Sequence, residues 1–307
     1  MAGPRIVSLL PSATEIVAAL GMRPNLVGRS HECDYPEDVQ RVPVMTRARV
    51  DPLKPSRRIH RDVQEMIRKA LSVFEVDVDR LKAAKPDIIL TQNQCAACAV
   101  HEDQLAEAVN TWTGAKPVIL SLAPARLSDV WADFGRVGDI LDIGWAGREL
   151  SNRAKERVEI LGERMPEIEV RRRIACVEWF DPPMLAGNWI PELLTAMGAD
   201  PVGVKPGVHS ESTKLKDIVA LDPDGMILMP CGFDLARTAE EATPFLTRNT
   251  VARMRAVRTN EIWLADGSAY FNRPGPRLIT SLEILAEMLH PSAFNFGHEG
   301  TAWSKLG

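Results

Sequence analysis

The apolar residues of this chain are concentrated in short runs that alternate with longer segments of helical periodicity. In the first part of the chain four mainly apolar runs are expected to form buried strands: residues 6–10, 26–28, 88–90 and 118–120. Helices are expected between them, at residues 14–20, 63–74 and 78–84. Strands that alternate with helices are typical of βα units, which predicts a mostly parallel sheet.

The first expected helix carries apparent start and stop signals. Ser12 is a plausible N-cap, and Glu15 follows three residues later as the partner of a capping box. Gly21 is expected to end this helix, because glycine takes up the left-handed conformation that follows many helices.

Two further helices are expected in the middle of the chain, at residues 128–142 and 145–165. The second is rich in Arg and Glu, which favours an exposed helix. At 1.5 Å per residue it would be roughly 30 Å long, enough to connect two lobes.

Strand-like runs then resume at residues 173–178, 226–229 and 262–264, with helices expected at 191–197, 214–221 and 277–289. Residues 80–90 and 216–228 resemble each other, since each has a short helix, a Pro-Asp pair and an apolar strand. The sequence therefore predicts an α/β protein of two Rossmann-like lobes with mostly parallel sheets, joined by a long rigid helix. The expected domains are residues 1–125, a helical connector at 126–167, and residues 168–307.

Ligands of open α/β sheets bind beyond the carboxyl ends of the strands, so the loops there are the candidate binding site. Aromatic residues in such loops suit a large flat ligand, although structural packing explains each of them equally well. They are Tyr35, Trp179, Phe180, Trp189, Phe233, Tyr270 and Phe271. His31 and His209 lie in two of the expected loops, either as ligand contacts or, more commonly, as hydrogen-bonding loop residues.

Thiols also follow three of the expected strands. Cys33, Cys95, Cys98 and Cys231 could together hold zinc, iron or an iron–sulfur cluster, and the Cys-x-x-Cys spacing of two of them also suits a redox disulfide. The alternative is that each is a small buried hydrophobe. Cys176 lies within a strand and is expected to pack in the core.

Composition excludes several classes of function. The formal net charge is −4, which gives no support to a nucleic-acid partner. No segment has the roughly 18 consecutive apolar residues of a membrane span. No Walker loop, Gly-x-Gly-x-x-Gly or Ser-His-Asp order occurs, so a conventional enzyme is not expected.

The first residues predict a location. Residues 6–20 are interrupted by polar residues and proline, unlike the unbroken apolar stretch of a secretory signal. Together with an odd number of cysteines, five in all, this predicts a cytoplasmic protein, or a periplasmic one if the true start lies upstream.

Four segments, taken in order, resemble a known family. They are Ser8-Leu9-Leu10-Pro11-Ser12-Ala13-Thr14-Glu15, Asp34-Tyr35-Pro36, Asp181-Pro182-Pro183-Met184 to Gly187, and Tyr270-Phe271-Asn272-Arg273 followed by Pro276-Arg277. This pattern is similar to that of ABC-transporter substrate-binding proteins that capture vitamin B12, iron siderophores and heme, and most similar to that of the vitamin B12 binders. The resemblance covers almost the whole chain.

The resemblance implies the class III periplasmic-binding-protein fold, with a cobalamin-like corrinoid held between the lobes. It implies ligand contacts from the last loop, Arg273 included, and from Tyr35, Trp179, Phe180, Tyr270 and Phe271. It also implies docking on an ABC permease through one acidic residue per lobe, where this chain has Asp79 and Lys216, and a lysine there weakens the charge pairing. We therefore expect a protein that binds a corrinoid or related metal compound; the alternative is a thiol-based metal or iron–sulfur protein with a redox or enzymatic role.

Overall fold

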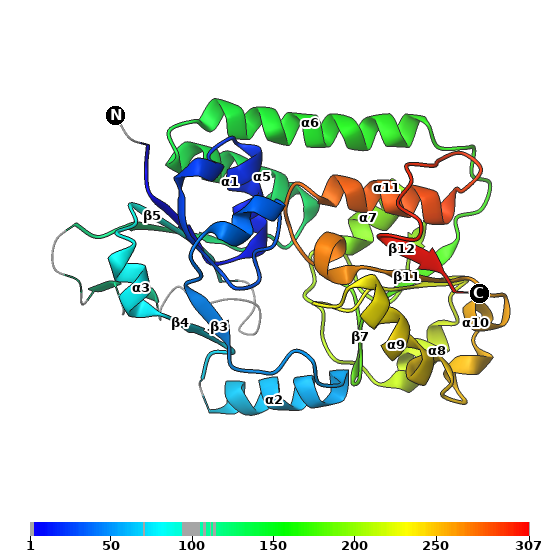
Figure 1. Ribbon diagram of the computed structural model, residues 1–307. Helices are drawn as coiled ribbons and strands as arrows, with labels where there is room; N and C mark the ends of the chain where they lie inside the picture. Colours follow the sequence, from blue (N-terminus) through cyan, green and yellow to red (C-terminus); the bar gives the residue numbers. More distant parts are fainter. Residues whose placement is uncertain are drawn as a thin grey trace. The chain divides into compact units, whose positions relative to one another are not determined.

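The computed structural model describes residues 3–69, 71–93, 105–106, 109–110, 112 and 115–306. By its internal contacts the chain forms two compact units (Figure 1). Unit 1 comprises Met1–Lys54, Arg61–Pro124 and Asp129–Arg153, and unit 2 comprises Pro55–His60, Ala125–Ser128 and Ala154–Gly307. The domain boundaries expected at residues 125 and 167 stay a prediction.

The sheet of unit 1 has the strand order β2-β1-β5-β6 and is parallel throughout. Its strands are β1 (Ile6–Ser8), β2 (Leu26–Arg29), β5 (Ile88–Gln92) and β6 (Val118–Leu122). All four were expected from the apolar runs. β1 and β5 lie inside the sheet and consist entirely of buried residues, which explains their continuous apolar character.

Helix α1 (Pro11–Ala19) begins earlier than expected. Leu10 is its N-cap, no side chain caps it, and Pro11 occupies the first turn. Proline suits this position because it has no N–H to satisfy and its φ is already helical. The expected capping box is therefore wrong, and Ser12 and Glu15 are each only 3% exposed. Gly21 does follow the helix with φ +77°, as predicted.

The helix expected at residues 63–74 is wrong at both ends. Helix α2 spans Ser56–Arg68, and the following Phe74–Val76 forms strand β4. β4 pairs antiparallel with β3 (Thr46–Ala48) in a separate two-stranded sheet. Pairing with a segment nearly thirty residues earlier overrides the local helical pattern of these residues. Unit 1 also has η1 (Arg23–Asn25), η2 (Glu37–Arg41), α3 (Val78–Ala83) and α5 (Leu127–Ile140).

Helix α6 (Gly144–Glu163) is the long helix expected from the sequence, and it is continuous over 20 residues. Its first half counts with unit 1 and its second half, from Ala154, with unit 2. Trp145 is 70% exposed, whereas Leu161 is fully buried, so the helix is exposed only in part.

Unit 2 contains a sheet with the order β12-β11-β10-β7-β8, in which β9 also pairs with β7. β7 (Arg173–Phe180), β10 (Gly225–Leu228) and β11 (Ile262–Ala265) are parallel to one another, as expected. The sequence did not predict β8 (Pro183–Leu185), β9 (Asp200–Pro201) or β12 (Trp303–Lys305). β8 and β12 run antiparallel to β7 and β11.

The helices expected in unit 2 occur as α7 (Ile190–Ala196), α8 (Leu215–Leu221) and α11 (Leu278–Leu289). Four further elements were not expected: α9 (Leu235–Leu246), η3 (Val251–Arg253), α10 (Arg255–Arg258) and the short π-helical turn η4 (Gly267–Phe271). A core of aliphatic and aromatic side chains, with Phe180 and Phe245 among them, packs between the sheet, α8 and α9. No helix among the described residues is long and apolar enough to cross a membrane.

The repeated Pro-Asp segments have the same structure in both units. After α3, Asp87 Oδ2 accepts a hydrogen bond from Arg5 N at 2.7 Å, and after α8, Asp224 Oδ2 accepts one from Arg173 N at 2.9 Å. The guanidinium groups of these two arginines donate to carbonyls at the ends of α3 and α8. The internal repeat is thus confirmed. In each unit an arginine at the start of the first strand binds both the Pro-Asp aspartate and the end of the helix before it.

Candidate functional site

In unit 2 the parallel strands β7, β10 and β11 end at one edge of the sheet, and polar and aromatic residues follow each of them. Glu178 and Trp179 are near the end of β7, Cys231 and Phe233 follow β10, and Asp266 follows β11. Cys231 N donates to Glu178 O at 3.1 Å, which ties the ends of β7 and β10 together. This edge is where an open α/β sheet binds ligands.

A contact between two tilted aromatic rings, with a guanidinium over one of them, lies at this edge and is here called the Trp179 cluster. The rings of Trp179 and Phe233 are 5.4 Å apart, and the guanidinium carbon of Arg237 is 3.8 Å from the centre of the Phe233 ring. Trp179 is half-buried, and its buried Nε1 has no hydrogen-bond partner among the residues that the structure describes. A buried indole N–H without an acceptor is costly, which makes it a candidate donor to a ligand.

Glu178 belongs to a short polar network next to Trp179 in the chain. Ser210 Oγ donates to Glu178 Oε2 at 3.0 Å and accepts a bond from Gly187 N at 2.9 Å. The neighbouring His209 is exposed and lies in the loop where the sequence placed it. A role for His209 in ligand binding stays a prediction.

The loop after β11 is held by close backbone contacts. Asp266 Oδ1 accepts a bond from Ala269 N at 2.7 Å, and burial raises the pKa of this carboxyl above its ordinary value. Gly267 approaches β10 so closely that an added Cβ would lie 2.4 Å from both Met229 O and Pro230 O. Only glycine fits there, and this fixes the path of the chain toward Tyr270.

Tyr270 is half-buried, and the Arg277 guanidinium lies 5.5 Å from the centre of its ring. The Tyr270 carbonyl accepts a bond from Ser281 Oγ of α11 at 2.9 Å, which secures the loop to that helix. Because Tyr270 is only half-buried, it remains a candidate ligand contact. Arg273 is 9% exposed, and its role as a ligand contact stays a prediction.

Three of the expected aromatic contacts are core residues instead. Phe180 is 2% exposed and packs against Phe245 at 5.3 Å between ring centres, and Phe271 is fully buried. Trp189 is 5% exposed and donates its indole N–H to Phe271 O at 3.0 Å. These side chains stabilise unit 2 and are withdrawn as ligand contacts. Phe233 is 2% exposed as well, so it is a packing partner of the Trp179 ring, tilted against it by 54°, and not an accessible ligand contact.

In unit 1 the end of β2 holds a hydrogen-bonded cluster. His31 N donates to Thr46 Oγ1 at 3.0 Å, His31 Nδ1 lies 2.7 Å from the same oxygen, and Thr46 Oγ1 is 3.1 Å from Ser30 Oγ. Burial and the nearby Arg29 lower the pKa of the His31 ring. These contacts match the alternative in which His31 is a hydrogen-bonding loop residue. Tyr35 is 49% exposed and remains a candidate contact.

A hollow of about 420 Å³ lies at the ends of β5 and β6 in unit 1. Asn93, Ser121 and Asp133 are among its lining residues. Asp133 is 3% exposed, pairs with Arg136 at 2.7 Å, and has a pKa raised by burial. Among the described residues, Ser121 Oγ and Asp133 Oδ2 are buried without a hydrogen-bond partner. Both oxygens are thus candidates to receive N–H groups of a ligand.

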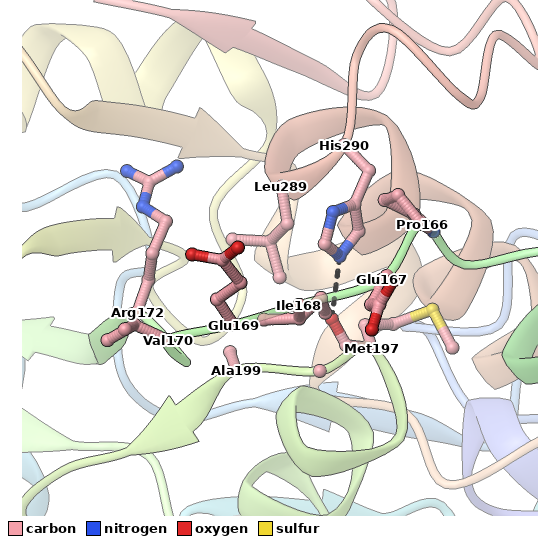
Figure 2. Close-up of a pocket in the computed structure, with 11 residues that line it drawn as sticks. Pro166, Glu167, Ile168, Glu169, Val170, Arg172, Met197, Ala199, Leu289 and His290 are labelled. Atoms are coloured by element: carbon pink, nitrogen blue, oxygen red, sulfur yellow. Dashed lines mark hydrogen bonds between the residues drawn. The ribbon is translucent and has the colours of Figure 1, made fainter.

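A second hollow, in unit 2, lies at the other end of the sheet. Figure 2 shows this cavity of about 270 Å³, between the segment that precedes β7 and the end of α11. His290 Nε2 is 2.9 Å from Met197 O, and Arg172 pairs with Glu261. These polar groups already have hydrogen-bond or ion-pair partners within the protein, which disfavours this cavity as the ligand site.

The four candidate thiols have different surroundings. Cys33 is 1% exposed and accepts a hydrogen bond from Thr14 Oγ1 at 3.1 Å, whereas Cys231 is exposed; Cys95 and Cys98 lie outside the described residues. Within the part of the chain that is described, no group of three or more His, Cys, Asp or Glu could hold a metal. A thiol metal site stays a prediction. Cys176 packs in the core as expected, and burial raises the pKa of its thiol.

Several site residues were missed by sequence reasoning: Glu178, Ser210, Arg237, Ser121 and Asp133. The only available signal was their position, since Glu178 and Ser121 occupy polar positions near the ends of apolar strands. Ser210 and Arg237 approach the other residues only through the fold, over long sequence separations.

Comparisons with known proteins agree with this architecture. An uncharacterized ABC transporter substrate-binding lipoprotein of Bacillus subtilis, YvrC, is 22% identical over 296 residues, covering 94% of this chain and 81% of that protein. Among solved structures, a periplasmic heme-binding protein from Pseudomonas aeruginosa has a TM-score of 0.69 at 18% identity, covering 95% of this chain and 94% of that one. The vitamin B12 binding protein BtuF of Vibrio cholerae has a TM-score of 0.66 at 16% identity, covering 94% and 98%. At these identities the solved structures show the fold alone, which is the class III fold expected from the sequence.

The expectation of a cytoplasmic protein is wrong. The matching family consists of periplasmic binding proteins, and the relative in Bacillus subtilis is a lipoprotein. The error came from inferring a location from the first residues and the odd number of cysteines. Such proteins bind ligands without catalysis, and the family implies a small-molecule ligand and an ABC permease partner.

The family profile described as periplasmic binding protein matches residues 6–269, which is most of the chain. This chain belongs to the periplasmic binding protein family and is a binding protein, not an enzyme.

Proposed function

We propose that this protein captures a flat, metal-containing macrocycle, and that a cobalamin-like corrinoid is its preferred ligand. The observation that carries the proposal is the Trp179 cluster (Trp179, Phe233 and Arg237) at the ends of β7 and β10, with the buried Trp179 N–H that has no partner among the described residues. A ring face without charge suits the face of a macrocycle, and the N–H suits a carbonyl at the macrocycle's edge.

The unpartnered oxygens of unit 1 favour a corrinoid over a heme. Ser121 Oγ and Asp133 Oδ2 are both buried without a hydrogen-bond partner among the described residues, and burial raises the pKa of the Asp133 carboxyl. Amide groups at the edge of a corrinoid supply both N–H donors and carbonyl acceptors. The carboxylates of a heme supply acceptors only, whereas an amide can donate to one of these oxygens and accept from the Ser121 hydroxyl.

Tyr35 and Tyr270 complete the proposed contacts. Tyr35 is 49% exposed and Tyr270 is half-buried, so both present a phenol at the surface of their unit. Neighbouring proteins with this fold are described as binding heme or vitamin B12, which supports a macrocyclic ligand without choosing between them.

The permease contact is proposed at the first turns of α3 and α8, which the repeat makes equivalent. Asp79 is exposed at the first turn of α3. On α8 the matching Lys216 is followed by Asp217, which is also exposed. Asp217 thus supplies an acidic group in the first turn of α8, next to the lysine that stands at the expected docking position.

Titration calorimetry with cyanocobalamin, hemin and a ferric siderophore tests the ligand class. We expect the tightest binding for cyanocobalamin, and weaker binding for a corrinoid whose edge amides are hydrolysed to carboxylates. Trp179→Phe keeps an aromatic side chain, though a smaller one, and removes the N–H, and it is expected to weaken binding about 3- to 10-fold. Trp145→Phe is the matched control, because Trp145 is 70% exposed on α6 and is expected to leave binding unchanged. Tighter binding of hemin, or equal effects of the two substitutions, would contradict the proposal.

A further inference from the structure

Helix α2 (Ser56–Arg68) lies on the surface to an unusual degree. Of its 13 residues only Ser56 is buried. Four aliphatic residues recur at helical spacing and form one apolar stripe, here called the α2 stripe: Ile59, Val63, Met66 and Ile67. Such a stripe normally packs against a core. Here no described helix or strand packs extensively along α2.

The apolar surface continues at both ends of the helix. Ile67 is 40% exposed, Leu53 before the helix is 83% exposed, and Leu71 after it is 46% exposed. Within the α2 stripe Ile59, Val63 and Met66 are half-buried and Ile67 is exposed, so with Leu53 and Leu71 this one segment carries six aliphatic side chains that are at least partly accessible. Single exposed aliphatic residues are common on protein surfaces, but a set on one helix marks an interaction site.

The other side of α2 is strongly basic. Arg57, Arg58 and Arg61 are all exposed near its start, and Arg68 is exposed at its end. Residues 47–69 contain eight Lys or Arg and three Asp or Glu, a net charge of +5 in a chain whose formal net charge is −4. The segment around this helix is therefore net positive, whereas the rest of the chain, with 29 Lys or Arg and 38 Asp or Glu, has a formal net charge of −9.

An exposed helix with an aliphatic stripe and a basic polar face is the pattern of helices that lie on membrane surfaces. We propose that α2, with Leu53 and Leu71, binds the surface of a bilayer that contains anionic lipids. The basic face would meet lipid phosphates, and the aliphatic side chains would enter the boundary between headgroups and acyl chains. Protein interfaces are usually centred on aromatic residues, and residues 47–73 contain no Trp, Tyr or Phe.

The helix is already ordered for this contact. Glu241 of α9 accepts hydrogen bonds from Ser56 N at 3.2 Å and from Ser56 Oγ at 2.9 Å, which fixes the first turn of α2. A helix that is formed before binding does not have to be ordered by the membrane, so the cost of coupled folding is avoided.

Flotation of the purified chain with lipid vesicles tests this proposal. The vesicles are phosphatidylcholine alone, or phosphatidylcholine with about one third phosphatidylglycerol. We expect binding to the anionic vesicles at low salt, little binding to the neutral ones, and release as the salt concentration rises. The triple variant Arg57→Gln, Arg58→Gln and Arg61→Gln is expected to bind about 100-fold more weakly, at about one decade for every 1.4 kcal/mol and about 1 kcal/mol per cation.

A matched control removes the same charge elsewhere: Arg171→Gln, Arg253→Gln and Arg258→Gln, all at exposed positions. This control is expected to bind anionic vesicles like the parent, and Leu53→Ser with Ile67→Ser is expected to reduce binding at unchanged charge. Circular dichroism and corrinoid titration verify that each variant is folded and binds ligand, which keeps this test separate from that of the proposed function. Absence of binding to anionic vesicles, or equal losses in the α2 and control variants, would overturn the proposal. Binding only to vesicles that carry an ABC permease would instead assign α2 to a protein partner.

Discussion

Glu287 of helix α11 holds the C-terminal segment of unit 2, and its replacement by Gln is a sharp test of how that unit is stabilised. The carboxylate is 3% exposed. Its Oε1 accepts bonds from the backbone N–H groups of Phe296, Gly297 (2.7 Å) and His298 (3.3 Å), and its Oε2 accepts one from Trp303 Nε1 at 2.7 Å. Trp303 begins β12, so this side chain connects α11 to an edge strand of the sheet.

The magnitude follows from these contacts. Gln keeps one carbonyl oxygen for the backbone donors but turns an NH2 group toward the Trp303 N–H, so one buried donor loses its acceptor. A hydrogen bond to a charged group contributes about 1.5–3 kcal/mol, and the remaining bonds weaken when the charge is removed. We expect Glu287→Gln to destabilise the protein by about 3 kcal/mol. For a unit of this size the melting temperature should fall by about 6–12 °C.

The pH dependence gives a second readout. Burial alone would raise the pKa of Glu287, but the bonds from Trp303, Phe296, His298 and Gly297 outweigh it and hold the pKa below its ordinary value of 4.5. A carboxyl with a lowered pKa in the folded state stabilises the protein above its unfolded pKa, and this contribution is lost as the pH falls through the folded pKa. The difference between parent and variant should therefore shrink below about pH 4.5.

Thermal unfolding followed by circular dichroism at several pH values measures both effects. Trp303→Phe removes the indole N–H that donates to Glu287. The double variant should lose less stability than the sum of the losses in the two single variants. Equal melting temperatures of parent and Glu287→Gln at neutral pH, or a difference that does not change with pH, would refute this reasoning.

Three other predictions concern the edge of the unit 2 sheet. Gly267→Ala should destabilise the protein by about 1–3 kcal/mol in denaturant unfolding, because its Cβ would meet Met229 O and Pro230 O; an unchanged midpoint would contradict this. Asp266→Asn keeps the acceptor for Ala269 N and removes a charge that burial disfavours, so melting at neutral pH should be equal to or higher than that of the parent, with the difference disappearing in acid. Removing the Arg237 guanidinium with Arg237→Met should shift the Trp179 fluorescence, since Arg237 covers the Phe233 ring that contacts Trp179; an unchanged spectrum would count against the Trp179 cluster.

Much of the fold was predictable because it depends on local patterns. The parallel strands are short apolar runs. The aspartate of each Pro-Asp pair binds the backbone at the start of β1 in unit 1 and of β7 in unit 2. The errors in predicted secondary structure occurred where pairing with a distant segment determines the local structure. Phe74–Val76 follows a helical pattern but pairs with Thr46–Ala48. The edge strands β8, β9 and β12 have two or three residues each, too few to show a periodic pattern.

The site was predictable only as a set of loops. Trp179 and Phe180 are adjacent in β7, and neighbouring residues of a strand point to opposite faces, so one was bound to be a core residue. The register shift between Val177 and Trp179 in the pairing with β8 influences which face each one takes, and this shift has no signature in the sequence. Likewise nothing local links Ser210 to Glu178, which are 32 residues apart.

The central claim is that these strand ends capture a corrinoid, and the most direct measurement is calorimetric titration of the purified protein with cyanocobalamin. The account predicts saturable binding of one corrinoid per chain, weakened by Trp179→Phe and unaffected by Trp145→Phe. Absence of any saturable binding of cyanocobalamin by a folded protein would contradict it.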